Sequence, residues 1–160
     1  MSSNRFRPSV TVAAVAERNG RFLLVEEDIR GRLMLNQPAG HLEPAESLID
    51  AVIRETREET GHVFVPEAVL GIYLWARPDD GLTYLRVAFR GDVDAEPHGK
   101  LDVGIVRAVW LTLDELHAMQ PRHRSPLVLR CVQDHIAGIS HSLSVLSALD
   151  LAAAARAQKS

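Results

Sequence analysis

The chain has 160 residues, 46% of them hydrophobic, which is enough for one compact domain with a core and too few for two domains of ordinary size. Its formal net charge at pH 7 is -3, from 18 Lys and Arg against 21 Asp and Glu, and no basic stripe runs along the sequence. These values argue against a nucleic-acid polymer as a partner, because such proteins neutralise many phosphates with clustered Lys and Arg.

The N-terminal segment MSSNRFRPS carries two arginines but no export signal behind them. The apolar run that follows is interrupted by Glu17, Arg18 and Asn19, which leaves it too short for a signal peptide. We therefore expect residues 1–7 to form a flexible N-terminus and the protein to be cytoplasmic.

Five segments have the composition of β-strands. Residues 10–16 and 21–26 are short apolar runs, and the Asn19-Gly20 pair between them is a strong signal for a hairpin turn. Three more runs are rich in β-branched and aromatic residues and are bounded by Gly, Pro or Asp. These further predicted strands are residues 69–76, 84–91 and 105–111.

Four segments have the periodicity or composition of helices, namely residues 45–60, 113–119, 126–137 and 142–157. Strands on both sides of the first helix, with further helices at the end, predict a mixed sheet covered by helices, of the α+β class. The C-terminal segment is alanine-rich, but five polar residues divide it well before membrane-spanning length. We expect a domain over residues 8–138, then a helix and frayed tail over 139–160, and no membrane association.

The helix predicted over residues 45–60 carries an unfavourable charge cluster. Its apolar face is expected to bury Ala45, Leu48, Ile49, Val52 and Thr56. Near its C-terminal end, Glu55, Glu58 and Glu59 stand at positions i, i+3 and i+4, where each like-charge neighbour costs roughly 0.2–0.5 kcal/mol and the helix dipole adds to the repulsion. A bound divalent cation would remove this repulsion. The alternative is ordinary surface pairing of these glutamates with Arg54 and Arg57.

The spacing around this cluster matches a known pattern. Gly40 is followed by five residues and Glu46, then by seven residues and the run Arg54-Glu55-Thr56-Arg57-Glu58-Glu59-Thr60-Gly61. This arrangement resembles the Nudix box, and Gly61 stands where a left-handed residue ends the helix. Two positions depart from the usual large aliphatic residue, since the chain has Thr56 and His62 there.

The resemblance implies an α/β/α sandwich and a metal-dependent hydrolase of phosphoanhydride bonds, with Mg²⁺ as cofactor and Mn²⁺ as the alternative. Glu55 and Glu59 would be direct metal ligands, and Glu58 either a ligand or the base that orients water. The backbone carbonyl of Ala39 would complete the metal shell beside Gly40. Two further residues would act indirectly, with Arg54 orienting the glutamates and Glu46 steadying the loop.

The resemblance extends over about residues 8–138 and is closest to a NudJ-type bacterial phosphatase subgroup of the same family. The segments that carry it include VTVAA, FLLVEE, NQPAGHLE, Leu85-Arg86, Trp110-Leu111 and RSPLV. The subgroup removes phosphate from nucleoside tri- and diphosphates and from hydroxymethylpyrimidine diphosphate. A small nucleotide or diphosphate is therefore the expected substrate.

Several residues outside the glutamates are candidates for substrate binding. Arg86 is expected either to reach a substrate phosphate or to form a surface ion pair. Trp75 is expected either to stack on a base or to pack in the core with Tyr73. His41 and Gly40 lie in the part of the box that precedes its helix, here called the box loop, and would stand near the substrate. Glu96 and Asp102, in a polar loop, are alternatives to Glu58 as general base.

Three questions stay open at the level of sequence. A rival to the hydrolase is a nucleotide-sensing domain of similar fold that binds without turnover, although such domains usually lose the box glutamates. The products, orthophosphate or pyrophosphate, and the oligomeric state, monomer or homodimer, are not specified. The lone Cys131 is expected to be a buried structural thiol.

Overall fold

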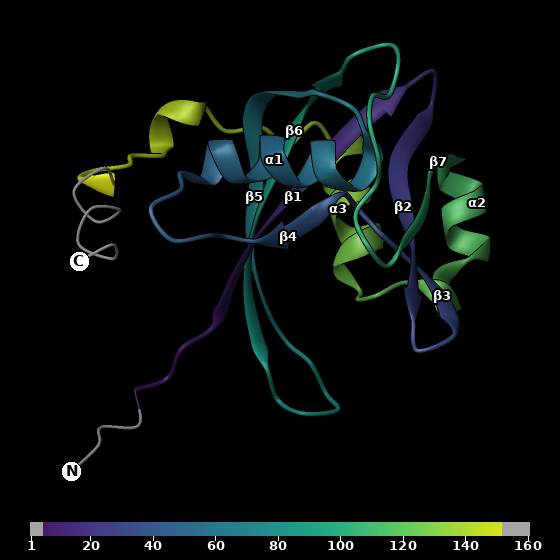
Figure 1. The fold of residues 1–160 in the computed structure, drawn as a ribbon, viewed down its shortest axis with the longest axis horizontal. Coiled ribbons are helices and arrows are strands. Elements are labelled where there is room, and N and C mark those ends of the chain that lie inside the picture. The colour runs from purple at the N-terminus through teal and green to yellow at the C-terminus, as the bar shows by residue number, and fades with distance from the viewer. Residues whose placement is uncertain (1–4, 152–160) are drawn as a thin grey trace.

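A mixed β-sheet forms the centre of the molecule, and helices lie on both of its faces (Figure 1). The computed structural model describes residues 5–151. The main strand order is β3-β2-β1-β6-β5, with β4 paired to β1 and β7 paired to β2. The strands are β1 (Ser9–Arg18), β2 (Arg21–Ile29), β3 (Arg32–Asn36), β4 (Ala39–His41), β5 (Phe64–Ala76), β6 (Thr83–Val93) and β7 (Ile105–Thr112).

All five predicted strands are present, and the Asn19-Gly20 turn joins β1 to β2 with positive φ at both residues, 52° and 73°. Strands β3 and β4 are additional to the prediction. Both are short, and β4 has three residues that pair with β1 between Thr11 and Ala13. This pairing brings the start of the box loop against the central strand.

The helices are α1 (Leu48–Thr60), α2 (Leu113–Ala118) and α3 (Leu127–Ile136), with short 3-10 turns η1 (Gln120–Arg122) and η2 (Leu143–Val145). Alternate residues of β1 enter two different cores: Val12 packs with Val52 of α1, whereas Ala13 packs with Val128 of α3. The expected helix–sheet–helix sandwich is thus confirmed. Cys131 of α3 is fully buried, and burial raises the pKa of its thiol to about 11.

Helix α1 begins three residues later than predicted. Ser47 is its N-cap, and its side chain accepts a hydrogen bond from the Asp50 backbone N–H at 3.1 Å. Ala45 lies before the cap with φ at 62°, so it is not part of the buried helical face. A capping residue such as Asp, Ser or Asn is a stronger signal for the start of a helix than an apolar residue that fits the helical periodicity.

The helix expected over residues 142–157 is not formed over residues 142–150. The Ser142 side chain accepts from the Ser144 N–H at 3.2 Å and closes the single turn η2, after which the chain is non-helical until Leu151. Just before this turn, His141 and Val69 exchange two backbone hydrogen bonds, which holds the segment in an extended conformation against β5. Residues 152–157 of the expected helix lie outside the described residues.

Within residues 5–151, no helix has both the length and the apolar composition that crossing a membrane requires.

The end of α1 is closed by Gly61, as predicted, with φ at 76° and its N–H donating to the Arg57 carbonyl. His62 follows in a buried position, 5% exposed, and its Nδ1 lies 3.0 Å from the Asp94 carbonyl oxygen. Its ring also meets Trp110 edge-on at 6.3 Å. The unusual histidine is thus accommodated by a polar partner on one side and an aromatic partner on the other.

We predict that Gly61→Ala lowers the free energy of unfolding by about 1–2 kcal/mol, since an L-residue resists this left-handed conformation. A Cβ at Gly61 would also lie 3.0 Å from the backbone of His98. Gly99→Ala is the matched control, because Gly99 has φ at 90° but no atom within 4 Å of the added carbon. Urea unfolding should show the larger loss for Gly61→Ala, and equal losses would refute the steric contribution.

Candidate active site

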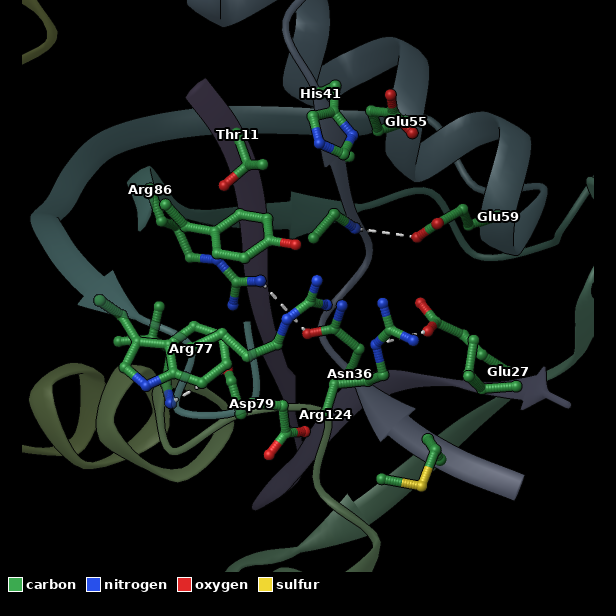
Figure 2. A pocket seen from close by; sticks show the side chains of 18 of the residues that line it. Thr11, Glu27, Asn36, His41, Glu55, Glu59, Arg77, Asp79, Arg86 and Arg124 are labelled. Atoms are coloured by element: carbon green, nitrogen blue, oxygen red, sulfur yellow. Dashed lines mark hydrogen bonds and ion pairs between the residues drawn. The ribbon is translucent and has the colours of Figure 1, made fainter. Parts of the chain in front are cut away.

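A cavity of about 550 Å³ opens between the box residues and the hairpin formed by β5 and β6. Figure 2 shows Glu55 and Glu59, carried by α1, on one side and Arg77, Asp79 and Arg86 on the opposite side. Strand β4 and the segment before α3 complete the walls. Segments far apart in the sequence therefore meet around one space.

Glu59 is a buried carboxylate, only 8% exposed, on the cavity wall. Burial raises its pKa to about 8, and the charges of Glu27, Glu55 and Asp102 add to this effect, while a 2.8 Å hydrogen bond from the Ala39 N–H opposes it. Glu59 takes part in no ion pair with any described residue. A cation beside it would supply the missing positive charge.

Glu55 lies against the backbone of β4 because Gly40 has no side chain. A Cβ at Gly40 would stand 2.1 Å from the Glu55 carboxyl carbon, so any larger residue there would displace the carboxylate. Burial raises the pKa of Glu55. The missing side chain of Gly40 thus leaves room for the Glu55 carboxylate, and the N–H of the neighbouring Ala39 binds the Glu59 carboxylate.

Arg54 connects the box loop to the helix. Its guanidinium donates to Glu46 at 2.7 and 2.9 Å, to Glu55 at 2.7 Å, to Glu58 at 3.0 Å and to the His41 carbonyl at 3.1 Å. These partners raise the pKa of Arg54. The surface-pairing alternative therefore accounts for Glu55 and Glu58 but leaves Glu59 unexplained.

Glu58 occupies a different position from the other two glutamates. Its side chain is 39% exposed and faces a neighbouring hollow with His98 and Lys100, outside the walls of the main cavity. Asp102, by contrast, lies close enough to raise the pKa of both Glu55 and Glu59 by its charge, and its N–H donates to the Glu58 carbonyl at 2.9 Å. Glu96 is exposed and is not among the main causes of either pKa shift.

The residues present fit a divalent cation in part. Two carboxylate groups, from Glu55 and Glu59, share the cavity wall, and oxygen donors of this kind suit Mg²⁺. In the part of the chain that is described, no three Asp, Glu, His or Cys side chains converge into a complete metal cluster. Glu58 would have to turn from Arg54 to join the two carboxylates.

Arg86 is not a surface residue, which corrects one of the two expectations for it. It is 8% exposed on β6, the strand next to the central strand β1, and lines the cavity. Its terminal nitrogens donate to Gln37 at 3.3 Å and to Asn36 at 3.4 Å, and no carboxylate among residues 5–151 forms an ion pair with it. Burial lowers its pKa.

Trp75 lines the cavity, whereas Tyr73 turns to the core and donates a 2.8 Å hydrogen bond to Asp134. The core-packing alternative thus holds for Tyr73 and is wrong for Trp75. The Trp75 ring stacks on Tyr84 at 5.7 Å with 22° between the planes, and the Arg77 guanidinium lies 5.7 Å from the Tyr84 ring centre. His41, exposed in the box loop, is 6.5 Å from Tyr84.

Several lining residues were not predicted as site residues, although four of them lie in segments that carry the family resemblance. One signal was available, because Glu27 ends a buried apolar run and is itself only 9% exposed, paired with Arg124 at 3.3 Å. A buried charge at the end of a strand indicates a partner or a site. The lining residues that were not predicted include Thr11, Glu27, Asn36, Arg77, Asp79, Tyr84 and Arg124.

Comparisons with known proteins agree with this geometry. A model of the NUDIX domain matches residues 5–130. The chain is 36% identical over 145 residues to phosphatase NudJ of Escherichia coli strain K12, covering 88% of this chain and 92% of the relative. A solved NUDIX hydrolase from Nitrosomonas europaea is 53% identical, with a TM-score of 0.87 and coverage of 90% and 99%. The NUDIX domain of Shewanella oneidensis NrtR, solved with ADP ribose, is 17% identical with a TM-score of 0.68, covering 85% and 93%, and shows the fold alone.

We predict that Arg54→Met lowers the free energy of unfolding by about 1–3 kcal/mol, since it leaves partly buried carboxylates without their cation. Arg57→Met, on the exposed side of the same helix, is the control, because Arg57 forms no ion pair with any described residue. Urea unfolding of both variants measures the difference. A loss in Arg54→Met no larger than in Arg57→Met would contradict the role of Arg54.

Proposed function

The chain belongs to the NUDIX family of hydrolases, and on that premise we propose that it cleaves phosphoanhydride bonds in nucleoside tri- and diphosphates or related small diphosphates. One observation carries the proposal: the buried Glu59, beside Glu55, shares a cavity with the buried guanidinium of Arg86. The carboxylates suit a cation, and Arg86 suits the phosphates that such a cation would bind.

The proposed metal is Mg²⁺, with Mn²⁺ as an alternative, held by Glu55 and Glu59 with the Ala39 carbonyl and Glu58 as further ligands. When bound, such a cation neutralises phosphate charge and makes a water molecule more acidic. The absence of a side chain at Gly40 supports this assignment, since it leaves room for the Glu55 carboxylate at the strand. Asp102 is the more suitable additional acid, because its charge is among the main causes that raise the pKa of both glutamates.

The residues around the glutamates would act by positioning. Arg54 holds Glu55 and Glu58 in place and is itself fixed by Glu46, which also accepts the Glu43 N–H at 3.1 Å. The loop that carries His41 is tied to the helix by the same guanidinium. Fixing charged groups before the substrate arrives is a large part of catalysis of phosphoryl transfer.

The organic part of the substrate would lie against the stacked rings of Trp75 and Tyr84. Both rings line the cavity, and a planar base or pyrimidine could extend this stack. The E. coli relative is named a phosphatase, which supports release of phosphate from such a substrate. A sensing role without turnover is less well supported, because the box glutamates are retained and the similar proteins with substantial identity are named as enzymes.

We predict that Glu55→Gln and Glu59→Gln each lower kcat/KM by more than about a hundred-fold, since each removes a charged ligand from the proposed metal site. Phosphate release from a panel of nucleotides and small diphosphates, with Mg²⁺ or with chelator, measures the loss. Glu67→Gln is the control, because Glu67 is exposed on β5 outside the cavity. Full activity of both site variants, or activity that survives the chelator, would rule out the mechanism.

We also predict that Trp75→Leu raises KM for nucleotides by about two- to ten-fold, since a stacked aromatic pair contributes roughly 0.5–1.5 kcal/mol. Hydrolysis of tripolyphosphate, which has no ring, provides the comparison and should change much less. Steady-state kinetics on the two substrates gives the ratio. An equal change for both would mean that the ring of Trp75 does not contact the organic group.

A further inference from the structure

We propose that Thr11 and Arg86 together form a subsite for one phosphoryl group, adjacent to the phosphoryl group held at the glutamates. The ligand identity rests on the proposed function, but the subsite itself rests on the geometry of two neighbouring strands. In this subsite Thr11, a residue on β1 far outside the box, binds the phosphoryl group together with Arg86.

The two side chains are brought together by the register of the sheet. Strands β1 and β6 run parallel, and Thr11 is the direct partner of Arg86 in that pairing. Partner residues on adjacent strands project from the same face of a sheet. Both residues line the cavity, and Figure 2 shows both side chains pointing into it from the side opposite Glu59.

Both side chains are buried, and each has one polar atom without a hydrogen-bond partner among the described residues. Thr11 is 5% exposed, and its hydroxyl has no partner among the described residues. Arg86 is 8% exposed, its Nε is likewise unpartnered within residues 5–151, and its other bonds, at 3.3 and 3.4 Å, are long and reach only amide oxygens. Buried polar atoms are nearly always satisfied, so two unsatisfied donors side by side in a cavity wall indicate a ligand.

The donors define the chemistry of that ligand. A guanidinium with a free Nε and a hydroxyl both donate, so the ligand must present acceptor oxygens and negative charge. Glu27, a carboxylate whose charge acts on Arg86, is already paired with Arg124 at 3.3 Å. A phosphoryl group meets these requirements.

The subsite lies in the same cavity as Glu55 and Glu59. The charge of Glu59 acts on Arg86, which places the guanidinium within electrostatic range of the proposed metal ligands. A diphosphate has two phosphoryl groups joined by one oxygen, so one can rest at the glutamates while its neighbour rests on Thr11 and Arg86. The subsite would thereby fix which phosphorus is presented for attack.

Thr11→Val is the decisive variant, because it removes the hydroxyl and keeps the shape of the side chain. If the hydroxyl is only an unsatisfied atom, its removal leaves ligand binding unchanged. Under the proposal, Thr11→Val binds inorganic phosphate about ten-fold more weakly in the presence of chelator, as expected for a lost hydrogen bond to a charged group. The same variant raises KM for a nucleotide by a similar factor, with a smaller change in kcat.

The protein without ligand should be at least as stable in Thr11→Val as in the wild type, because an unmatched buried donor has been removed. Thr83→Val, on β6 but outside the cavity, is the control for the methyl substitution. Arg86→Met provides a second route to the same loss, with Arg90→Met as its control on the same strand. Calorimetric titration with phosphate and thermal unfolding supply the measurements.

The outcomes separate this proposal from the proposed function. Weaker phosphate binding in Thr11→Val and Arg86→Met supports the subsite even if no substrate is turned over, in which case the proposed function alone fails. Unchanged phosphate affinity in both variants overturns the subsite, as does wild-type protein that binds no phosphate. In an active enzyme, a change in product inhibition with no change in KM also overturns it, because the subsite would then hold only free phosphate and not the substrate.

Discussion

The contact between helix α1 and strand β4 is the constraint on which the candidate site depends. The Glu55 carboxylate occupies the space that a side chain at Gly40 would fill, and Glu59 accepts the N–H of Ala39. Strand β4 is itself paired to β1, so the position of both carboxylates is set by the central strand of the sheet. The acidic end of the cavity is therefore fixed by backbone geometry, and Arg54 adds electrostatic support to Glu46, Glu55 and Glu58.

The parts of this arrangement that depend on local signals could be predicted from the sequence. The Asn19-Gly20 turn, the helix end at Gly61 and the clustering of the glutamates each follow from spacing or from the conformational preference of a residue. Two local predictions were wrong for local reasons. A serine cap at Ser47 overrode the apolar periodicity at Ala45, and hydrogen bonding between Ser142 and Ser144 replaced the expected helix by one turn.

The remaining part of the site depends on contacts between distant segments, which no local pattern contains. Thr11 is an ordinary strand residue until the register places it beside Arg86, 75 positions away in the chain. The stacking of Trp75 on Tyr84 likewise arises from the pairing of β5 with β6. The two arginines illustrate the difference: Arg54 could be assigned from its motif, whereas the environment of Arg86 required the fold.

The hairpin of β5 and β6 extends beyond the helices (Figure 1). It carries the stacked rings of Trp75 and Tyr84, which belong to neither hydrophobic core. Its turn is held locally, with the Arg77 N–H bonded to the Leu82 carbonyl and Asp80 paired to the Arg77 side chain. Substitutions in this turn would therefore disturb few contacts that stabilise the fold. Under the proposed function, substitutions in the hairpin would change substrate preference at little cost in stability, whereas substitutions at the proposed phosphate subsite would alter residues next to the central strand β1.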